Sequence, residues 1–345
     1  MVSRTAAYVA MYRALETLEP KPVIRDPYAI RFLPRELAMA VRASRVAPVR
    51  KLLLRYADHR APGARTSAIA RTAAIDELVY QLVFSGLCRQ VVLLGAGFDA
   101  RAHRLPELAG VPVFEVDRRE TQASKRAHVP ASKVTYVEVD FLRDDAFAKL
   151  EAAGWKRDQA SLIIWEGVTN YLTEAAVLRV LSEVGRCAAG TRIVFTYIHR
   201  GVLDGSHAFV GGEQIRANVA KLGEPWTFGL EPSAVGDFVA RAGLVLRRDH
   251  GADEYRREWL GKTSPGYAFY RLAVAERTDH DAIHQCDECE SSYVAATSRM
   301  SALCPECSHI LYGYPNCEHA FVDGRCTKCG WNGARSAYIR RLLER

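Results

Sequence analysis

The chain has 345 residues, of which 49% are hydrophobic and 25% are charged. This length and composition allow a substantial core and predict one large domain together with a smaller one. No stretch approaches about 18 uninterrupted apolar residues, so a membrane-spanning helix is excluded and we expect a soluble, cytoplasmic protein. The formal net charge is +7, a modest excess for this length that makes nucleic acid only a minor possibility as a partner.

The first 85 residues have helical periodicity that prolines interrupt. They predict a helical cap that precedes the first sheet strand, within a large domain of residues 1–278. The basic excess of the chain also lies mainly here, and it indicates a solvated helix face or, alternatively, attraction of an acidic substrate or partner. The prolines are Pro20, Pro22, Pro27, Pro34 and Pro62, and the clustered basic residues are Arg42, Arg45, Arg50, Lys51, Arg55, Arg60, Arg65 and Arg71.

An apolar run from Val91 ends in a glycine-rich turn and passes directly into a helix-like pattern. The turn consists of Gly95, Ala96 and Gly97, and this order is typical of a nucleotide-binding α/β domain. A second apolar run stops at Asp117, about 20 residues beyond the glycines, where a carboxylate can accept hydrogen bonds from ribose hydroxyls. The two patterns together predict a site for a nucleoside cofactor.

The pattern alone leaves the identity of the nucleoside open. The segment from Gly95 to Ala100 also fits a loose dinucleotide fingerprint, so an NAD-dependent oxidoreductase is one hypothesis. Asp99, however, places a negative charge in the turn where a pyrophosphate would lie, and a helix N-terminus attracts anions less when it already carries one. A ligand with positive charge suits this turn better. S-adenosylmethionine, with its sulfonium and ammonium groups, is such a ligand.

Strands and helical patterns alternate through most of residues 91–275. This alternation predicts an α/β fold with a doubly wound, mainly parallel, Rossmann-like sheet. Ligands of such sheets bind outside the carboxyl ends of the strands, so Asp140 and Phe141, after the third strand, and Glu166, after the fourth, are candidate site residues. The expected strands are Val91–Leu94, Val113–Val116, Thr135–Val139, Leu162–Trp165, Arg192–Thr196, Leu244–Arg248 and Tyr270–Ala275.

Seven of the nine cysteines lie between Cys286 and Cys329, in a segment that we assign to a small domain of residues 279–345. They form Cys-x2-Cys pairs and one Cys-x-His pair, with the spacing of tetrahedral zinc sites. A sequential assignment, in which each set closes a short loop, predicts two structural zinc ions in a zinc-ribbon-like module. The ligands are Cys286, Cys289, Cys304 and Cys307 in the first set, and Cys317, His319, Cys326 and Cys329 in the second.

Alternatives to this assignment stay open at the level of the sequence. The two sets could be cross-paired, and oxidation could turn a Cys-x2-Cys pair into a disulfide, although a reducing compartment favours metal. A catalytic zinc needs an open coordination position, and both sets are full, so we expect structural ions. The segment from His284 to Arg345 has seven basic and seven acidic residues, which favours a protein contact or a packing role over nucleic-acid binding.

Several separately spaced segments between Ser3 and about Arg277 form an ordered set, which is far more specific than one glycine turn. They are SRTAAYVAMYRALE, RDPYAIRFL, RTAAIDEL, VVLLGAGFDARAHRL, FEVDRRETQASKRA, VEVDFLRD, IIWEGVTNYLTEAAVLRVL and FGLEPSAVGDFVARAGL. In this set the chain resembles the leucine carboxyl methyltransferase family. That class I S-adenosylmethionine-dependent group includes many bacterial small-molecule and polyketide O-methyltransferases.

The resemblance implies a cofactor and roles for several residues. S-adenosylmethionine would donate the methyl group. Asp140 and Phe141 would contact its adenine, and Arg71, in RTAAIDEL, would pair with the methionine carboxylate in a charge-assisted contact. Glu166 would face the methionine part or the sulfonium. The resemblance also implies that the last strand is antiparallel and that the N-terminal helices help to cover the active site.

The implied reaction is transfer of a methyl group to an oxygen of a small or carrier-bound acceptor. A carboxylate is ionised at pH 7 and needs no general base, whereas a hydroxyl needs one. No unambiguous base stands out, which slightly favours a carboxylate. Tyr171 and His199 are candidate catalytic residues by position only. Thr169 and Asn170 suggest a polar acceptor, because many bacterial members read EGLLMYL where this chain has EGVTNYL.

Three functional hypotheses follow from the sequence. The first is a small-molecule or carrier-bound O-methyltransferase of specialised bacterial metabolism. The second is a methyltransferase that acts on a protein or an RNA delivered by the zinc module. The third is the NAD-dependent oxidoreductase that the glycine pattern alone permits, and Asp99 together with the ordered motifs disfavours it.

Overall fold

The computed structural model describes residues 4–141, 143–278 and 283–344. The chain divides into two compact units, Met1–Arg277 and Thr278–Arg345, each with its own hydrophobic core. The predicted domains, 1–278 and 279–345, meet beside residues 279–282, which lie outside the described residues. No helix within the described part of the chain is long and apolar enough to cross a membrane.

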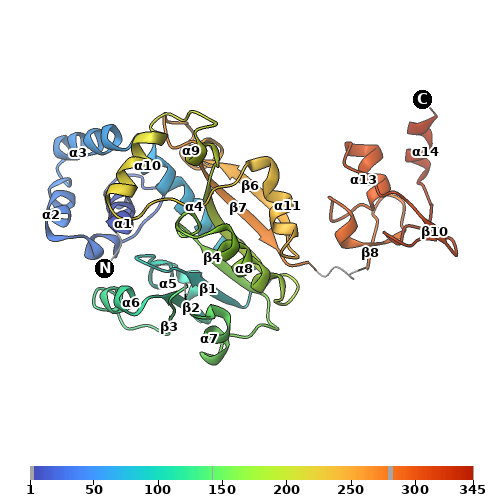
Figure 1. Cartoon of the computed structure of the whole chain (residues 1–345), viewed down its shortest axis with the longest axis horizontal. Helices are drawn as coiled ribbons and strands as arrows, with labels where there is room; N and C mark the ends of the chain where they lie inside the picture. The colour runs from blue at the N-terminus through green and yellow to red at the C-terminus, as the bar shows by residue number, and fades with distance from the viewer. Residues whose placement is uncertain (1–3, 142, 279–282, 345) are drawn as a thin grey trace. The chain divides into compact units, whose positions relative to one another are not determined.

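A seven-stranded sheet forms the centre of the first unit, with the strand order β3-β2-β1-β4-β5-β7-β6 (Figure 1). Strands β1 to β5 are parallel, and β7 runs antiparallel to both β5 and β6. The predicted doubly wound sheet is confirmed, and so is the antiparallel last strand. The strands are β1 Gln90–Leu94, β2 Val113–Asp117, β3 Thr135–Glu138, β4 Ser161–Trp165, β5 Arg192–Ile198, β6 Val245–Gly251 and β7 Tyr270–Glu276.

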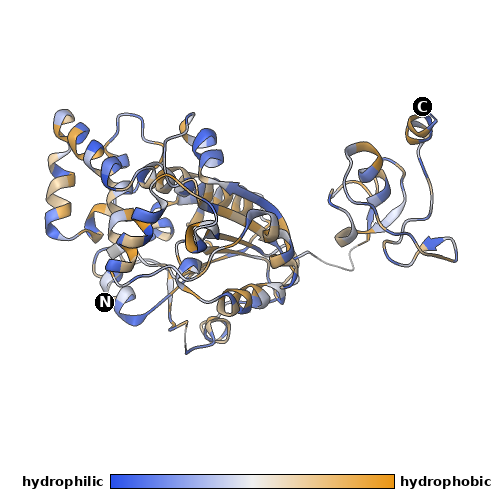
Figure 2. Ribbon diagram, turned by 45° about the horizontal axis from the view of Figure 1, so that its top comes forward, coloured by the Kyte–Doolittle hydropathy of each residue, from blue (hydrophilic) through white to orange (hydrophobic). Residues whose placement is uncertain are grey.

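The central strands are apolar because both faces of the sheet are covered. Val91 and Leu93 of β1 belong to one core cluster, and Val92 and Leu94 belong to the other, as the two-residue period of a strand requires. Figure 2 shows hydrophobic residues concentrated along the strands. The covering helices are α4 (Ala64–Phe84) and α12 (Ala252–Leu260) on the first face, and α7 (Ala146–Ala152), α8 (Glu174–Gly185) and α11 (Val235–Ala240) on the second.

Two strands extend at least two residues beyond their predicted ends. β5 continues to Ile198 and β6 to Gly251, because these residues pair with Tyr270 and Arg271 at the beginning of β7. The remaining elements of the first unit are short connections. They are α5 (Arg101–Arg104), η2 (Pro106–Leu108), α6 (Arg119–Arg126), η3 (Thr169–Tyr171), α9 (Gly201–Asp204), α10 (Gly212–Lys221) and η4 (Pro232–Ala234).

Helices precede β1, as the periodicity of the first 85 residues predicts. Prolines lie where these helices begin or end: Pro34 occupies the N-cap position of α2, and Pro62 lies between α3 and α4. Phe32 stacks on Phe98 in the loop after β1, with ring centroids 4.9 Å apart, so the cap packs on that loop. The cap consists of α1 (Arg4–Thr17), η1 (Ala29–Phe32), α2 (Arg35–Ala43) and α3 (Ala47–Arg60), followed by α4.

The second unit is small, and cysteines form much of its core. Tyr293, Trp331 and Ile339 are buried among the sulfur atoms. Two antiparallel strand pairs, β8 with β9 and β10 with β11, hold the loops that carry the cysteines. The elements are β8 (Ile283–Gln285), β9 (Ser292–Val294), η5 (Ala295–Thr297), α13 (Pro305–Tyr312), β10 (Phe321–Val322), β11 (Arg325–Cys326) and α14 (Ala337–Leu343).

One buried arginine ties α12 to the cap. Arg256 is completely buried, and its guanidinium donates to the carbonyl oxygens of Gly63 at 2.7 Å and of Gly266 at 2.8 Å. It also donates to the carbonyl oxygen of Ser264 at 2.9 Å. Gly63 precedes α4, so this one side chain joins the start of α4 to the loop that leads into β7.

We expect Arg256→Met to lower the free energy of unfolding by roughly 3 kcal/mol or more, because buried carbonyl oxygens lose a charged donor. Urea unfolding followed by circular dichroism measures the change. The neighbouring Arg257 is exposed, and Arg257→Met, as the matched control, should change stability by less than about 0.5 kcal/mol. Similar effects of the two substitutions would contradict this role.

Candidate active site

The turn after β1 has a backbone that glycine adopts more readily than other residues. Gly95 and Gly97 have φ angles of 68° and 43°. A Cβ on Gly95 would lie 2.5 Å from Cγ2 of Val168, whereas no described atom lies closer than 3.8 Å to the same position on Gly97. Asp117, at the end of β2, accepts a hydrogen bond from the Gly97 amide at 2.6 Å. Gly97 therefore leaves open space next to a carboxylate, whereas Gly95 allows the close approach of Val168.

A cavity of about 640 Å³ lies at the carboxyl ends of the parallel strands. Its volume is within the range of small-molecule sites, roughly 300–1,000 Å³. Thr5, Val9 and Arg13 of α1 line it, so the N-terminal helix covers the site, as the family resemblance implies. The nine residues predicted to bind the cofactor all line the cavity: Arg71, Gly95, Ala96, Gly97, Asp99, Asp117, Asp140, Phe141 and Glu166.

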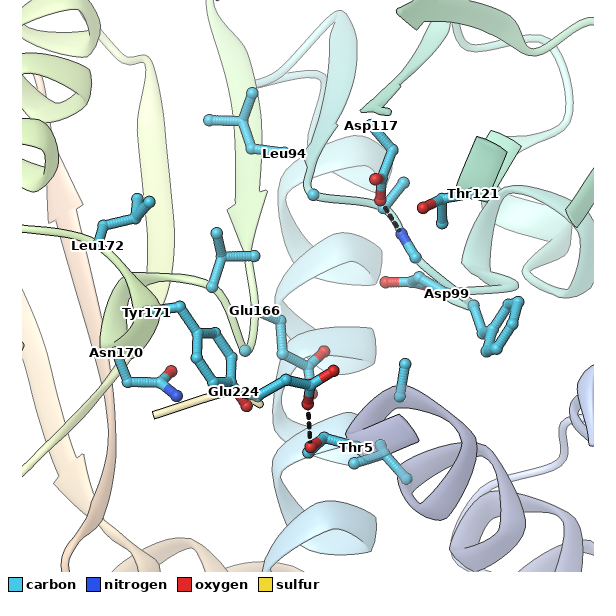
Figure 3. Close-up of a pocket in the computed structure, with 18 of the residues that line it drawn as sticks. Thr5, Leu94, Asp99, Asp117, Thr121, Glu166, Asn170, Tyr171, Leu172 and Glu224 are labelled. Carbon is cyan, nitrogen blue, oxygen red and sulfur yellow. Dashed lines mark hydrogen bonds between the residues drawn. The ribbon is translucent and has the colours of Figure 1, made fainter. Parts of the chain in front are cut away.

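The strand order divides this cavity into two halves. β1, β2 and β3 lie on one side of β4, and the residues that follow them form what we call the glycine half, which contains Asp117. The other part, here the tyrosine half, contains Asn170, and Glu166 lies between the two (Figure 3). The tyrosine half is formed by residues 170–172, 222–227, 267 and 270.

Glu166, which follows β4, is held by two arginines. Its Oε1 accepts a hydrogen bond from Nε of Arg71 at 2.7 Å, and its Oε2 accepts one from Nη1 of Arg101 at 2.8 Å. Arg101 also pairs with Asp99 and with Asp76. Asp99 is therefore neutralised by an arginine, and α5 is only four residues long. The prediction that Asp99 disfavours a pyrophosphate in this turn is therefore not supported, because its charge is compensated.

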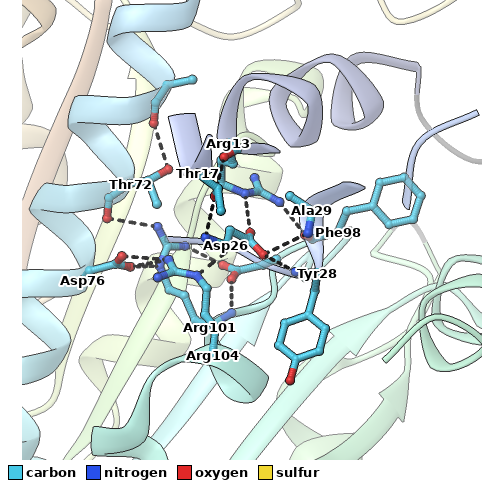
Figure 4. A network of polar contacts seen from close by, with 12 residues as sticks. Arg13, Thr17, Asp26, Tyr28, Ala29, Thr72, Asp76, Phe98, Arg101 and Arg104 are labelled. Carbon is cyan, nitrogen blue, oxygen red and sulfur yellow. Dashed lines mark hydrogen bonds and ion pairs between the residues drawn. The ribbon is translucent and has the colours of Figure 1, made fainter. Parts of the chain in front are cut away.

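The same ion pairs continue into the cap (Figure 4). Asp76 pairs with Arg104 at 2.7 Å, and Arg13 of α1 pairs with Asp26 at 2.9 Å. Arg13 also donates to the carbonyl oxygen of Phe98 at 2.6 Å, directly after the glycine turn. The formal charges balance in this group, which we call the arginine network. It consists of Arg13, Arg71, Arg101 and Arg104 with Asp26, Asp76, Asp99 and Glu166.

The network keeps Glu166 ionised and fixes Arg71. Burial by itself would raise the pKa of Glu166, but the guanidinium groups of Arg101 and Arg71 outweigh it and hold the pKa well below its usual range. Arg71 also lies over the ring of Tyr270, 4.6 Å from the centroid. Within the described part of the chain, Glu166 is the hydrogen-bond partner of Arg71, and it takes only Nε. The two Nη groups stay available for a ligand.

The two predicted catalytic residues lie in different places. Tyr171 lines the tyrosine half, and burial raises the pKa of its hydroxyl to about 12. The phenol stays protonated at neutral pH, so it can orient an acceptor but is unsuited to act as a base. His199 is not among the residues that line the cavity. Its Nδ1 accepts a hydrogen bond from the Gly201 amide at 3.0 Å, and its Nε2 lies 3.4 Å from Glu231. The geometry therefore gives neither residue support as a base.

Nothing in the sequence marks Glu224 as a site residue. It lies after α10 and lines the cavity, and its Oε2 accepts a hydrogen bond from Thr5, which is 219 positions away in the chain (Figure 3). No described residue donates a hydrogen bond to its Oε1. Two segments so far apart meet only in the folded chain, so no local pattern could reveal this carboxylate. Asn170, which the sequence does single out, is 1% exposed and lines the same cavity.

Comparison with known proteins decides the family. The family model of leucine carboxyl methyltransferases matches residues 6–185, more than half of the chain. The chain belongs to the leucine carboxyl methyltransferase family. The resemblance found in the sequence motifs is thereby confirmed. It also places the chain among S-adenosylmethionine-dependent methyltransferases, and the hypothesis of an NAD-dependent oxidoreductase loses its support.

Sequence relatives agree with this assignment, and a solved structure shares the fold. The chain is 38% identical to a predicted S-adenosyl-L-methionine-dependent methyltransferase of Frankia alni over 214 residues, which are 58% of this chain and 70% of that protein. It is 31% identical to another from Mycobacterium sp. strain JLS over 250 residues, 67% of this chain and 76% of that protein. A DUF574 family protein from Streptomyces avermitilis shares the fold, with a TM-score of 0.52 at 12% identity, covering 80% of this chain and 98% of that chain.

The second unit of the methyltransferase gathers the eight predicted metal ligands into two groups. The groups are those of the sequential assignment, and within each one the ligand atoms lie within 4.8 Å of one another. The sulfur atoms of Cys289 and Cys304 are 3.7 Å apart, and those of Cys317 and Cys326 are 3.9 Å apart. Thiolates around one tetrahedral zinc, with Zn–S bonds of about 2.3 Å, are about 3.8 Å apart. The spacing therefore fits one zinc ion in each group.

A buried carboxylate supports the histidine of the second group. Nδ1 of His319 lies 3.4 Å from the sulfur of Cys329, and Nε2 lies 3.4 Å from Glu306. Glu306 also accepts hydrogen bonds from Asn316 and Arg335. A carboxylate at Nε2 accepts the ring proton there and favours the tautomer that leaves Nδ1 free for a metal, an arrangement that is common for metal-bound histidines.

We expect Glu166→Gln to lower the free energy of unfolding at pH 7 by about 3–5 kcal/mol, because two buried arginines lose their shared counter-charge. The pKa of Glu166 is depressed in the folded state, so its contribution is complete above the unfolded pKa of about 4.5 and is lost as the pH falls below that value. The difference between wild type and variant should therefore shrink below about pH 4.5. Urea unfolding across pH 3–8 measures it, and a difference independent of pH would contradict the ionised state.

Proposed function

We propose that the chain transfers a methyl group from S-adenosylmethionine to an oxygen of a small or carrier-bound acceptor. The observation that carries the proposal is the meeting of all nine predicted cofactor residues in one cavity at the carboxyl ends of the strands. That cavity is also acidic. Outside the balanced arginine network, its described lining residues include three carboxylates, those of Asp117, Asp140 and Glu224, and one guanidinium group, that of Arg118. This excess of negative charge suits a sulfonium and an ammonium group.

The residues of the glycine half fit an adenosine. Gly97 leaves room beside Asp117, whose carboxylate can accept hydrogen bonds from ribose hydroxyls. Asp140 and the half-buried ring of Phe141 are proposed to contact the adenine. The Nη groups of Arg71 are proposed to bind the methionine carboxylate, with Glu166 fixing their position. When bound, the cofactor supplies an activated methyl group on sulfur.

The protein's part in the reaction is alignment and exclusion of water. Holding two reactants in attack geometry can remove roughly 7–11 kcal/mol of the barrier. With the cofactor held by these residues, the acceptor oxygen would bond to the methyl carbon as the carbon–sulfur bond broke and left its electron pair on sulfur. A carboxylate acceptor needs no general base. Because the sequence shows no clear base, it favours a carboxylate acceptor. Glu224 changes this balance, because its free oxygen can accept the proton of a hydroxyl.

Delivery of a protein or RNA by the second unit is the alternative function. The unit carries equal numbers of basic and acidic residues from His284 to Arg345, which speaks against nucleic acid. Tyr312 and Phe321 are exposed on it and would suit a protein contact. The cavity described above is about 640 Å³ in volume, so a small acceptor or the end of a carrier-bound chain remains our preferred substrate.

We further propose that the second unit holds two structural zinc ions. Each set offers four ligand atoms of the kinds that zinc prefers, at spacings that one ion would span. Both sets are complete, so no position is left for substrate or a catalytic water. A metal would supply cohesion that so small a core does not provide on its own.

Calorimetric titration tests the cofactor site. Wild-type protein should bind S-adenosylhomocysteine with micromolar affinity and should not bind NAD. Asp117→Ala should weaken the binding of S-adenosylhomocysteine at least tenfold, because hydrogen bonds to a charged group are worth about 1.5–3 kcal/mol each. Glu120→Gln, which changes an exposed carboxylate on α6, is the control and should bind normally. Binding of NAD alone would refute the proposal.

Elemental analysis tests the zinc sites. Purified protein should contain about two zinc ions per chain, and Cys304→Ser should contain about one, because only the first set loses a ligand. Cys88→Ser, a buried cysteine in the first unit, is the matched control and should keep both ions. One ion or none in the wild type would defeat the paired-site assignment.

A further inference from the structure

Resting on the proposed methyl transfer to oxygen, we propose that the acceptor is an uncharged, ring-bearing hydroxyl compound and that Glu224 selects it against carboxylates. Four features of the tyrosine half support this proposal. They are the charges that line it, the Oε1 of Glu224, the buried amide of Asn170 and the aromatic walls.

The charges disfavour a carboxylate acceptor. The cations among the described lining residues are Arg13, Arg71 and Arg118. Arg13 is committed to Asp26 and to a carbonyl oxygen, Arg71 belongs to the arginine network, and Arg118 directly follows Asp117 in the glycine half. Arg71 reaches the edge of the tyrosine half, where it lies over Tyr270, but its Nη groups are proposed to bind the methionine carboxylate. With the cofactor bound, no cation of the described lining is left to pair with an acceptor in this half. An acceptor carboxylate placed there would meet the like charge of Glu224, which costs free energy in a partly desolvated site.

Glu224 is placed to accept a hydrogen bond from an acceptor. Thr5 of α1 holds Oε2, and Oε1 has no donor among the described residues. The side chain is half-buried, and Figure 3 shows it beside Thr5 and Tyr171, near the middle of the cavity lining. A hydroxyl can donate to this free oxygen, whereas an ionised carboxylate has no hydrogen to donate.

A buried amide also lacks a partner in this half. Asn170 is only 1% exposed, and its Oδ1 has no hydrogen-bond partner in the described structure. Buried polar groups are nearly always hydrogen-bonded, so an unpaired amide in a cavity wall indicates a polar ligand. An amide is uncharged, offers both a donor and an acceptor, and matches a hydroxyl in both respects.

Aromatic rings form the rest of the wall. Trp226 is 8% exposed, and Tyr267 stacks on Tyr270 with ring centroids 5.4 Å apart. Burial raises the pKa of the Tyr171 hydroxyl to about 12, so the tyrosine adds no charge to this wall at neutral pH. Flat apolar surfaces with a few polar groups suit a cyclic or aromatic acceptor.

Matched probes that differ in one group test the proposal. Protein saturated with S-adenosylhomocysteine is titrated with 2-naphthol, 2-naphthoate and 2-naphthylmethylamine, and binding is followed by fluorescence. We expect 2-naphthol to bind at least tenfold more tightly than 2-naphthoate. Glu224→Gln removes the charge and keeps the shape, so it should strengthen the binding of 2-naphthoate and bring the ratio toward one. Glu213→Gln, an exposed carboxylate on α10, should leave the ratio unchanged.

The outcomes separate this inference from the proposed function. The inference is overturned if 2-naphthoate or the amine binds more tightly than 2-naphthol, if no probe binds, or if Glu224→Gln leaves the ratio unchanged. Failure of S-adenosylhomocysteine itself to bind would instead defeat the proposed methyl transfer. Thermal unfolding of Glu224→Gln with and without S-adenosylhomocysteine shows whether the variant is folded and keeps its cofactor site.

Discussion

The arginine network is the interaction on which the rest of the first unit depends. It joins α1, α4, α5, the loop after the glycine turn and the end of β4, which are segments from four separate parts of the chain. Four guanidinium groups face four carboxylates, so none of these buried charges lacks a partner. Removal of one charge would leave another uncompensated, which is why such networks tolerate few substitutions. The cavity wall and its helical cover are thereby fixed to each other by the same contacts.

This arrangement is consistent with methyl transfer, a reaction in which the protein itself need not supply the reactive group. The reactive group belongs to the cofactor, and the protein must hold two molecules in line in a cavity that excludes water. Because Glu166 is saturated by arginines, it acts through Arg71 and offers little free charge to a ligand. Glu224, whose Oε1 has no donor among the residues that the structure describes, lies on the other side, where α1 meets the segment after α10. We therefore propose that α1 and the segment after α10, which cover the cavity, select the acceptor, and that the residues at the strand ends bind the cofactor.

The second unit has too small an apolar core to be stabilised by hydrophobic packing alone. Its apolar core is small, and five of the buried side chains in it are cysteines. Proposed zinc ions would replace the cohesion that a larger core provides, and Glu306 would orient the histidine ligand. Glu306 also lies between Cys304 and Cys307 in the chain, so the segment that carries two ligands of the first group also supports the second group.

The sequence by itself predicted the positions of the strands, a mainly parallel sheet, the glycine turn, the candidate cofactor residues and the cysteines of the second unit, whereas the strand order and the grouping of the cysteines came from the structure. These features depend on local periods and short spacings, which are the same in the sequence and in the folded chain. Successive residues of β1 face opposite sides of the sheet, and the turn that follows β1 places Gly95 at a positive φ. Only the tertiary structure decided which charges are compensated and which side chains meet. Asp99 is neutralised by Arg101, His199 lies outside the cavity lining, and Glu224 reaches Thr5 across 219 positions. Each of these findings depends on contacts between segments that are distant in the chain. A pattern in the sequence does not show how close such segments lie in the folded protein.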